Sequence, residues 1–384
     1  MSSNESKSKL NRRSLLKLAG AAAGAAFVSR ASRAVAGRPS TILRTRLVHD
    51  FGLRTPLVSA GMAFVGLPDL AAAVANAGGI GVYGVGNELP DVLAQRLIKL
   101  RELTSGPFGV DFLVATSAFG DFTTQDHIDI TADAHVPLVV FHFGLPTAAW
   151  VTQLHAAGTQ VWCQTSSVSD ALQAVALGCD GIVAQGRSAG GHNRNSTVST
   201  FRLVAQMRRA LPARTMLLAS GGVSTGAQLV RAIRAGADGG WAGTVFVAAT
   251  ESYAHPDYKA RLVAAHAPSA TVFTTRFGPE WAGQQQRVLR NRATQEPLGT
   301  TPAQIGSTLL FPGVLDAPYP MPKYSAIVPT RDTIGDLEEM DMPAGAQSIR
   351  AVRRVRPAAE IVDDFIDAAH HACDRDDFDS LDDD

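Results

Sequence analysis

The sequence predicts a TIM (β/α)8 barrel, and three observations support this fold class. Eight short apolar or β-branched runs follow one another between about residues 45 and 250, and nearly all lead into a segment with helical periodicity. The runs are continuously apolar, as expected of parallel strands that are buried on both faces. Several of the helical segments repeat one stop signal, a glycine just after the last turn. An open doubly wound sheet is the alternative, but no single dominant GxGxxG follows the first run.

The predicted elements alternate regularly along the chain. The eight predicted strands are 55–62, 79–86, 108–115, 137–144, 159–166, 181–186, 216–222 and 239–248. Predicted helices follow six of them, at 67–79, 88–103, 145–158, 168–180, 200–211 and 225–238. The glycine-rich loop lies between the sixth strand and its helix, and a polar stretch follows the third strand. Strands that alternate with helices imply parallel pairing with right-handed crossovers. Eight such units in about 200 residues fit a barrel.

The chain after residue 250 has a different pattern, and we expect it to be an extension packed on the 45–250 barrel. The segments 255–267 and 280–292 predict helices separated by connectors rich in Pro and Gly, and 349–372 predicts a final amphipathic helix pair. We expect this extension, 251–372, to form one side of the active site. The acidic stretch 373–384 is expected to be a disordered, solvated tail.

The basic N-terminus, residues 1–36, has the layout of an export signal. Arg12-Arg13 precede a mildly apolar run that ends at Val28, and Ala34-Val35-Ala36 form a small-residue cleavage pattern. The apolar run is about half of what a bilayer span needs, so no stable membrane span is expected. This segment resembles a twin-arginine (Tat) signal. The resemblance implies export by the Tat machinery to the periplasm or the extracellular space after folding and cofactor loading, with the signal either cleaved or kept as an anchor.

The overall composition excludes several classes of protein. Lys plus Arg and Asp plus Glu both number 35, so the net charge is zero and nothing in it favours nucleic acid as a partner. The three cysteines form no CxxC pair, which argues against a disulfide scaffold and against a zinc site. We therefore expect a globular protein with a large core and no metal.

Chemistry in a TIM barrel lies at the C-terminal ends of the strands, so the residues there are the candidate site. The candidates for cofactor binding are Ala60, Gly61, Met62, Asp111, Gln164, Gln185, Gly190, Gly191, Ser220, Gly221, Gly222, Gly243 and Thr244. The last three strands thus end in glycine, which lets backbone N–H groups approach a ligand closely. The loops after strands 7 and 8 are the usual phosphate site of this fold. The pattern predicts a bound phosphate group.

Two histidines are candidate catalytic residues. His192 directly follows Gly190-Gly191 at the end of the sixth strand, and His142 ends the fourth strand between two phenylalanines. An imidazole near neutrality can stabilise an anion or remove a proton. His192 could instead simply hold its loop. His142 could be a second catalytic residue, a wall of the pocket or a satisfied core histidine.

The motifs at these strand ends together resemble the nitronate monooxygenase (2-nitropropane dioxygenase) family. The resemblance covers roughly residues 50–260 and rests on AGMAFVGLPDL, PFGVDF, VVFHFGLP, GIVAQGRSAGGHNR, LLASGGVSTG and GADGGWAGTVFVAATES. It implies an FMN-dependent barrel that oxidises a small anionic substrate, such as an alkyl nitronate, with dioxygen. It places Ala60–Met62 against the isoalloxazine and Gln164 and Gln185 beside the flavin. Gly190-Gly191, Ser220-Gly221-Gly222 and Gly243-Thr244 would cradle the phosphate and the ribityl chain. His192 would be the catalytic histidine that faces the substrate.

Some positions depart from the family pattern, and other functions stay open. Ser59-Ala60-Gly61 fill the place of a usual Gln and Pro, Asp111 stands where Asn is common, and Ser188 stands where Glu is frequent. The QGxxAGGH motif is shared with FMN-dependent enoyl-ACP reductases, which is the alternative activity. A non-catalytic FMN or phosphate-binding barrel, or a flavin-free barrel for a phosphosugar, also fits. The sequence leaves the oligomeric state open.

Overall fold

The structure, a computed structural model, describes residues 41–117, 120–278, 283–297 and 303–374. The predicted signal segment 1–36 and most of the predicted tail 373–384 lie outside the described residues. The division of the chain into a barrel (45–250), an extension (251–372) and a tail (373–384) stays a prediction.

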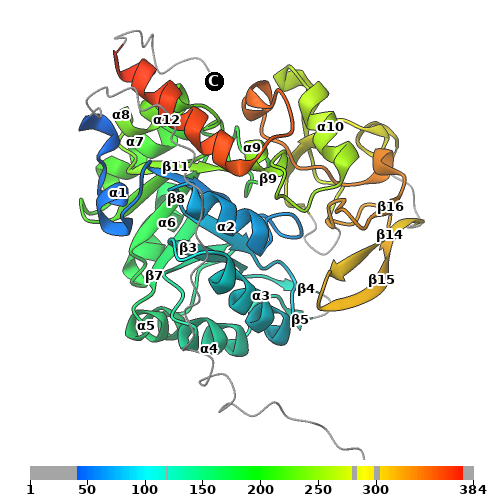
Figure 1. The fold of residues 1–384 in the computed structure, drawn as a ribbon, viewed down its shortest axis with the longest axis horizontal. Helices are drawn as coiled ribbons and strands as arrows, with labels where there is room; N and C mark the ends of the chain where they lie inside the picture. The colour runs from blue at the N-terminus through cyan, green and yellow to red at the C-terminus, as the bar shows by residue number, and fades with distance from the viewer. Residues whose placement is uncertain (1–40, 118–119, 279–282, 298–302, 375–384) are drawn as a thin grey trace, which may run out of the picture. The chain divides into compact units, whose positions relative to one another are not determined.

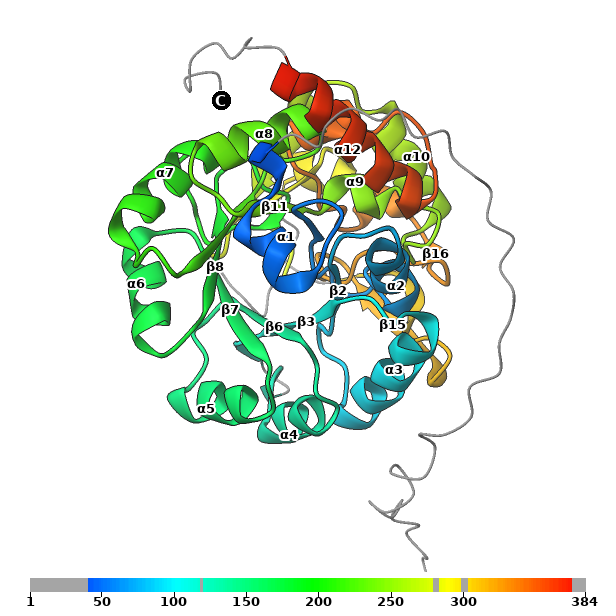
Figure 2. The ribbon, with the colours of Figure 1, turned by 60° about the vertical axis from the view of Figure 1, so that its left-hand side comes forward.

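Eight parallel strands form the predicted barrel (Figure 2). They are β1 (Leu57–Ser59), β2 (Gly81–Gly84), β3 (Phe108–Leu113), β6 (Leu138–His142), β7 (Gln160–Thr165), β8 (Gly181–Gln185), β10 (Met216–Ser220) and β11 (Gly239–Ala242). They lie in the order β1-β11-β10-β8-β7-β6-β3-β2. A parallel bridge between Val58 and Ile80 joins the two ends of this order. The TIM-barrel prediction is confirmed, and each strand lies inside its predicted range.

Helices cover the outside of the barrel (Figures 1 and 2). They are α2 (Pro68–Asn76), α3 (Pro90–Leu103), α4 (Gln125–Asp133), α5 (Ala148–Ala156), α6 (Val168–Ala176), α7 (Thr200–Ala210) and α8 (Gly226–Arg234). The predicted strand 239–248 ends early, because Thr244–Val247 form the short helix α9. The C-terminal helix α12 (Ala358–Asp374) packs against α8 and α2 and so completes the ring. Its contact with α8 is close, since a Cβ at Gly226 would lie 2.1 Å from the Ala369 nitrogen.

The N-terminal end of the barrel is closed by α1 (Arg46–Phe51). Leu47 is fully buried in one cluster with Trp162 and Trp241. Arg46 donates hydrogen bonds to the Thr215 carbonyl and to Asp238, which precede β10 and β11. A filled barrel with this end covered leaves the C-terminal strand ends as the place for a ligand.

The segment after α9 is only partly helical. It contains α10 (Pro256–Ala264), α11 (Arg292–Gln295), β12 (Thr271–Thr274), β13 (Gln286–Leu289), β14 (Gln304–Phe311), β15 (Leu315–Pro322) and β16 (Ile334–Gly335). The predicted helix over 280–292 is therefore wrong in its described part. The strand β13 lies between β12 and the two-residue strand β9 (Gly191–His192), and this pairing overrides the helical pattern. The predicted helix pair over 349–372 is a 3-10 turn (Ser348–Ala351) followed by α12.

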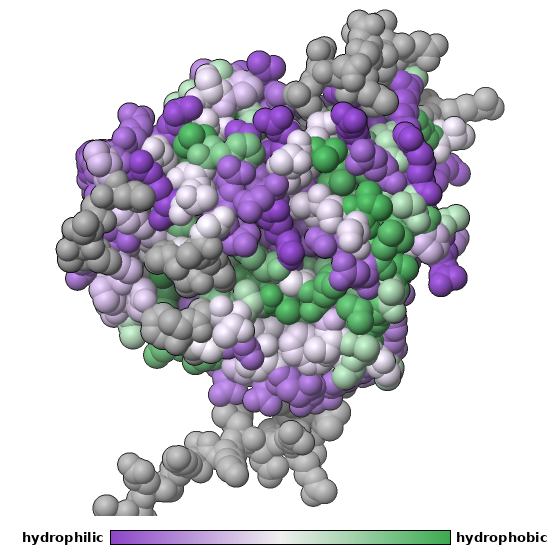
Figure 3. Space-filling view, turned by 180° about the vertical axis from the view of Figure 1, so that it is seen from behind, coloured by the Kyte–Doolittle hydropathy of each residue, from purple (hydrophilic) through white to green (hydrophobic). Residues whose placement is uncertain are grey.

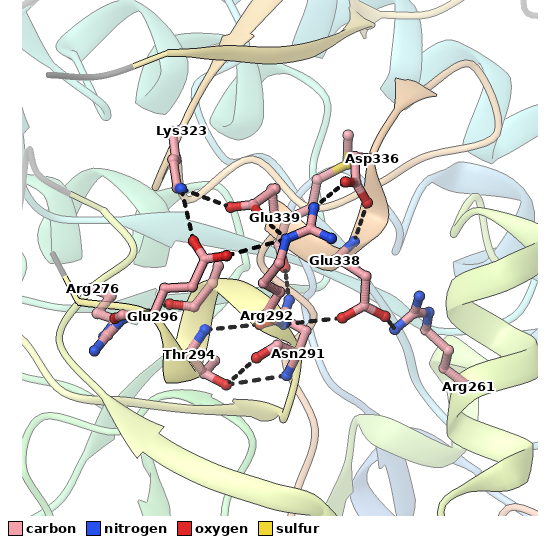
Figure 4. Close-up of polar contacts among 12 residues, drawn as sticks. Arg261, Arg276, Asn291, Arg292, Thr294, Glu296, Lys323, Asp336, Glu338 and Glu339 are labelled. Carbon is pink, nitrogen blue, oxygen red and sulfur yellow. Dashed lines mark hydrogen bonds and ion pairs between the residues drawn. The ribbon is translucent and has the colours of Figure 1, made fainter. Parts of the chain in front are cut away.

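A network of ion pairs ties this segment together beside β13 (Figure 4). Arg292 pairs with Asp336 and Glu339, and Lys323, directly after β15, pairs with Glu296 and Glu339. Arg261 on α10 pairs with Glu338. The chain after β13 is thereby linked to the base of the β14–β15 hairpin. The hairpin also touches the barrel at its turn, where Arg96 donates a hydrogen bond of 2.7 Å to the Pro312 carbonyl.

The surface carries exposed apolar side chains on several parts of the chain. The large exposed ones among the described residues are Leu89, Ile98, Leu103, Leu172, Leu315, Ile334 and Val355. Figure 3 shows hydrophobic residues (green) among the polar ones on the face turned away in Figure 1. In the described part of the chain, no helix combines the length and apolarity that crossing a membrane requires.

Candidate active site

A cavity of about 880 Å³ opens at the C-terminal ends of the barrel strands. It is lined by both predicted catalytic histidines and by all but one of the predicted cofactor-binding residues. These are His142, His192, Ala60, Gly61, Met62, Gln164, Gln185, Gly190, Gly191, Ser220, Gly221, Gly222, Gly243 and Thr244. The structure thus brings together strand ends that are up to about 180 residues apart in the sequence.

The glycines after β10 form a turn that other residues could not adopt easily. Gly221 has φ 104° and Gly222 has φ 76°, both in the left-handed region. A Cβ at Gly221 would lie 2.7 Å from the Ala189 nitrogen of the neighbouring loop. The chain at these positions can therefore present its backbone to the cavity, as the predicted phosphate site requires.

A strap from the C-terminal segment covers the ends of β8 and β11. The Gly345 N–H donates a hydrogen bond of 2.9 Å to the Thr244 hydroxyl, and the Ala346 N–H donates one of 3.3 Å to the Ser188 carbonyl. A Cβ at Gly190 would lie 2.6 Å from the Ala344 carbonyl carbon and the Gly345 nitrogen. Gly190 is thus needed for the close approach of two chain segments.

His192 is held from both sides. His192 pairs with Gln286 in the antiparallel β9–β13 ladder. The Gln185 side-chain amide donates a hydrogen bond of 2.9 Å to the His192 carbonyl. Gly191 before it has φ 69°, which turns the chain into the ladder. The glycines therefore serve the packing of the loop and its backbone path, and they leave the imidazole on the cavity wall.

His142 lies in the same polar group as Gln164. The Gln164 Nε2 is 3.1 Å from the His142 Nε2. Because an amide nitrogen only donates, this contact leaves the neutral His142 with its proton on Nδ1. Phe143 lies between the two histidines, with ring centroids 4.6 Å from His142 and 5.2 Å from His192. Arg194 donates a hydrogen bond to the Phe143 carbonyl and so fixes this residue, whose φ is 68°.

Both imidazoles are neutral at neutral pH. Burial lowers the pKa of His192 to about 4. Burial, together with the nearby His192 and Arg194, lowers the pKa of His142 to about 3. The expectation of a histidine that titrates near neutrality is therefore wrong for both residues, because the sequence does not show how deeply the strand ends are buried.

Asp111 does not line the cavity, although the sequence placed it among the cofactor-binding residues. It lies behind Gly61, where a Cβ on the glycine would be 2.2 Å from the Asp111 Cβ. Its Oδ1 has no hydrogen-bond partner among the described residues, and burial raises the pKa of the carboxyl well above its usual range. The side chain packs behind Gly61 in the Ala60–Met62 loop, and its burial disfavours the charged form of the carboxyl.

The sequence analysis missed Gln286, which lines the cavity from the C-terminal segment. Its side chain is fully buried, and neither its Oε1 nor its Nε2 hydrogen-bonds with a described residue. Directly opposed residues in an antiparallel ladder project to the same face, so Gln286 and His192 face the same side of the ladder, and both line the cavity. Its only sequence signal was a polar residue in a segment that looked helical, which gave no reason to place it here.

The lining residues fit a flavin nucleotide. Gln185 Oε1 is buried and has no partner among the described residues, as expected of a group whose partner is a ligand. The left-handed glycines after β10 and the Ser220 and Thr244 hydroxyls offer donors to a phosphate. The volume lies in the upper part of the roughly 300–1,000 Å³ range of ligand sites. Among the described residues, no group of three or more His, Cys, Asp or Glu is arranged to hold a metal ion.

A sequence model of one family matches residues 44–367, under the description nitronate monooxygenase. This chain belongs to the nitronate monooxygenase family. A relative named nitronate monooxygenase, from Paraburkholderia phytofirmans, is 30% identical over 299 residues, which are 67% of this chain and 78% of the relative. The family assignment makes the chain an oxidoreductase, and it supports the flavin cofactor that the sequence resemblance implied.

Two solved structures resemble this member of the family closely. FabK from Thermotoga maritima has a TM-score of 0.69 and 29% identity, with 86% of this chain and 97% of FabK covered. A nitroalkane oxidase from Streptomyces ansochromogenes has a TM-score of 0.68 and 27% identity, with 85% and 98% covered. The likeness extends beyond the barrel, since these shares exceed the 57–242 span of the barrel strands.

Proposed function

We propose that this chain is an FMN-dependent nitronate monooxygenase that oxidises alkyl nitronates, or the nitroalkanes from which they form, with dioxygen. The observation that carries the proposal is the position of His192. Its imidazole lines the same cavity as the glycine-rich ends of β8, β10 and β11. Family membership supports a small-molecule substrate and dioxygen as the reaction partners.

The residues assigned to FMN follow from their places on the cavity wall. Gly221, Gly222 and Thr244 would hold the phosphate through backbone and hydroxyl donors. Gln185, with its unsatisfied Oε1, would bond the polar edge of the ring system. When bound, the flavin supplies the electron acceptor and the reaction with dioxygen.

The protein's own part is to bind and orient the nitro group. The neutral His192 ring and the Gln286 amide lie on one face of the β9–β13 ladder, so both can bond oxygens of one nitro group. As a neutral imidazole, His192 is also in the form that accepts a proton from the α-carbon of a nitroalkane. His142 is held by Gln164 and shapes the adjoining wall.

The test is a visible spectrum of the purified protein without oxygen, before and after addition of an alkyl nitronate. A bound flavin whose absorbance is bleached by the nitronate and returns with air is the expected result. A flavin that ignores nitronates would overturn the proposal. Protein that holds no flavin after reconstitution with FMN would overturn the cofactor assignment as well.

The second candidate is a flavin-dependent reductase of enoyl thioesters, which the likeness to FabK favours. This reductase would differ from a nitronate monooxygenase in the compound that reduces the flavin, because reduction of an enoyl thioester needs NAD(P)H. Anaerobic bleaching by NAD(P)H and not by nitronates would select it. A flavin that neither reagent reduces would instead favour a non-catalytic carrier.

Export is a separate part of the proposal. Arg12-Arg13 and the apolar run that follows lie outside the described residues, and the support for a Tat signal is the sequence pattern alone. In its native host, the full-length chain should be recovered outside the cytoplasm, and an Arg12→Lys, Arg13→Lys double variant should stay inside. Equal distribution of the two forms would contradict a Tat signal.

A further inference from the structure

Two polar residues after β2, Asn87 and Glu88, line the cavity on the side of the barrel opposite His192. We call these two residues the polar corner. His192 follows β8, and three strands separate β8 from β2 in either direction round the ring (Figure 2). The cavity therefore extends across the barrel mouth, from the side assigned to the nitro group to the polar corner.

The side chains of the polar corner have hydrogen-bonding capacity that the described residues do not use. Glu88 is 6% exposed, and its Oε2 has no hydrogen-bond partner in the described part of the chain. The Asn87 Oδ1 is likewise a buried atom without a partner there. Because a buried polar atom without a partner is costly, two such atoms on a cavity lining indicate that a ligand or a water bonds them.

The backbone holds the polar corner in place. The Glu88 N–H donates a hydrogen bond of 3.3 Å to the Val85 carbonyl. The Glu88 carbonyl lies 2.8 Å from the His127 Nε2. The His127 Nδ1 accepts a hydrogen bond from the Thr124 N–H at the start of α4, so the proton of the neutral ring is on Nε2 and bonds this carbonyl. The corner is thus tied to β2 and to α4, and it is preorganised for a ligand.

Glu88 is a neutral acid at neutral pH. Burial raises its pKa to about 8, against the opposing charge of Arg96. A neutral carboxyl has one O–H donor and can also accept, whereas the Asn87 Oδ1 only accepts. The polar corner therefore offers one donor and one acceptor to a single ligand group.

A hydroxyl fits these two partners better than a charged group does. A carboxylate would face the Asn87 Oδ1, and no Lys or Arg among the described residues lines the cavity. An ammonium would lie near Arg96, whose Nε is 3.9 Å from the Glu88 Oε1. Either charge is costly to take out of water without a compensating partner. A hydroxyl can donate to Asn87 and accept from Glu88, so it satisfies both atoms.

We propose that the polar corner binds a hydroxyl of the substrate, so that the preferred substrate is a nitro compound with an alcohol group at the end remote from the nitro group. Asn87 and Glu88 then determine specificity without touching the reacting atoms. The inference rests on the proposed function, which supplies the nitro group. It adds a second polar group, which a simple alkyl nitronate lacks.

The test compares hydroxyl-ended with methyl-ended nitronates of equal length, over chains of three to eight carbons. Oxygen uptake by the flavin-loaded enzyme gives the ratio of the two kcat/KM values at each length. We expect the hydroxyl to be preferred by about tenfold at one length and less at shorter and longer ones, because the corner lies at a fixed distance from the nitro group. A ratio that is the same at every length, or that never favours the hydroxyl, would overturn the proposal.

Substitutions at Glu88 test which residue reads the hydroxyl. Glu88→Leu should lower the ratio at the best length to about one, whereas Glu88→Gln should keep most of it, because an amide also donates and accepts. The matched control is Glu102→Leu, at an exposed glutamate of α3 that is not on the cavity lining. Equal ratios in Glu88→Leu and Glu102→Leu would overturn the assignment. Should Glu88→Leu fail to fold, Asn87→Ala replaces it, with an expected fall of about fivefold in the ratio.

Two further results would also overturn the proposal. A lower flavin content or a shifted flavin absorption band in Glu88→Leu would show that the polar corner holds the cofactor and not the substrate. A carboxylate-ended or ammonium-ended nitronate that reacts faster than the hydroxyl-ended one of the same length would show that the corner binds a charged group.

A binding measurement separates this inference from the proposed function. Hydroxyl-ended and methyl-ended compounds with a tertiary nitro group have no α-hydrogen and cannot form a nitronate, so they bind without reacting. Isothermal titration of the flavin-loaded enzyme should show tighter binding of the hydroxyl-ended compound, and Glu88→Leu should remove the difference. If no nitronate is oxidised but this difference holds, the proposed reaction fails and the hydroxyl site stands. If nitronates are oxidised and the difference is absent, the hydroxyl site fails alone.

Discussion

His192 illustrates how local backbone and distant packing act together on one residue. Gly190 and Gly191 give its loop the shape, whereas β13, about 95 residues later, fixes its position through the Gln286 pairing. Burial keeps the ring neutral. At neutral pH the ring is therefore no permanent cation toward an anion.

Replacing His192 by Asn should separate catalysis from cofactor binding. We expect the variant to keep its flavin and to lose turnover by about 10²- to 10⁴-fold, the usual size of a lost acid–base group. Between pH 5.5 and 8, His192 should add no step to the pH profile of kcat/KM, since its pKa is about 4. Flavin content and a pH series of oxygen uptake check both points, and unchanged turnover would remove the catalytic role.

Gln286→Leu should lower kcat/KM for nitronates by about tenfold without loss of flavin. The reason is that leucine lacks the amide, so the hydrogen bond from this position to the nitro group is lost, which is worth about 1–1.5 kcal/mol. Its neighbour gives the matched control, because Gln285 directly precedes β13 and is not among the residues that line the cavity. Gln285→Leu should leave kcat/KM unchanged. Equal losses in the two variants would assign the effect to the strand and not to the amide.

Glu88 makes the stability of the protein depend on pH. Burial, opposed by the charge of Arg96, raises the pKa of Glu88 to about 8. The folded state thus holds a proton that the unfolded chain releases above about pH 4.5, so its stabilising effect is full below pH 4.5 and is lost as the pH rises to 8.

Glu88→Gln removes this titration. At pH 8.5 the free energy of unfolding of the variant should exceed that of the parent by roughly 2–4 kcal/mol, and this gain should shrink toward pH 5. Denaturant titrations at the two pH values measure it. A gain of the same size at pH 5 and pH 8.5 would show that protonation of Glu88 is not the cause.

At the scale of elements, the site depends on the strap that crosses the ends of β8 and β11. Gly190→Ala would force its new Cβ against the Ala344–Gly345 peptide, 2.6 Å away. We expect a loss of about 1–3 kcal/mol in stability together with a lower flavin content. Gly313→Ala, at the open hairpin turn with φ 75°, is the comparison. It should cost about 1 kcal/mol through backbone strain and leave the flavin content as it was.

The regular elements of the barrel could be predicted from sequence, and those of the extension could not. Strands such as Gly181–Gln185 are apolar throughout because both faces are buried, and this signal is local. The strand Gln286–Leu289 has no such signal, because it is defined by its partners β9 and β12. A short segment of mixed polar and apolar residues adopts the secondary structure that its hydrogen-bonding partners determine.

At the scale of the whole molecule, the C-terminal helix α12 fills a position in the outer ring of helices that the barrel segment itself leaves empty. The eighth strand is followed only by the short α9, and α12 takes the outer position between α8 and α2. Phe365 is 2% exposed and belongs to the main core. The extension is thus part of the barrel's stability as well as of its site.

Phe365→Ala should destabilise the whole protein by about 3–5 kcal/mol, because it leaves a cavity between α12 and the barrel. Chemical denaturation should show one cooperative transition shifted to lower denaturant. The control is Asp367→Ala on the exposed face of the same helix, with a change within about 0.5 kcal/mol. A small effect at Phe365 would mean that α12 is dispensable for the barrel.

The sequence by itself determined the barrel, the strand ends that form the site, and the two histidines and glycine turns on the cavity wall. The reason is that continuously apolar runs and turn residues are local properties of the chain. Only the tertiary structure decided the neutral state of both histidines, the position of Asp111 outside the cavity lining, and the entry of Gln286 into that lining. Each of these depends on burial or on contacts between segments far apart in the chain, and neither can be deduced from a single stretch of residues.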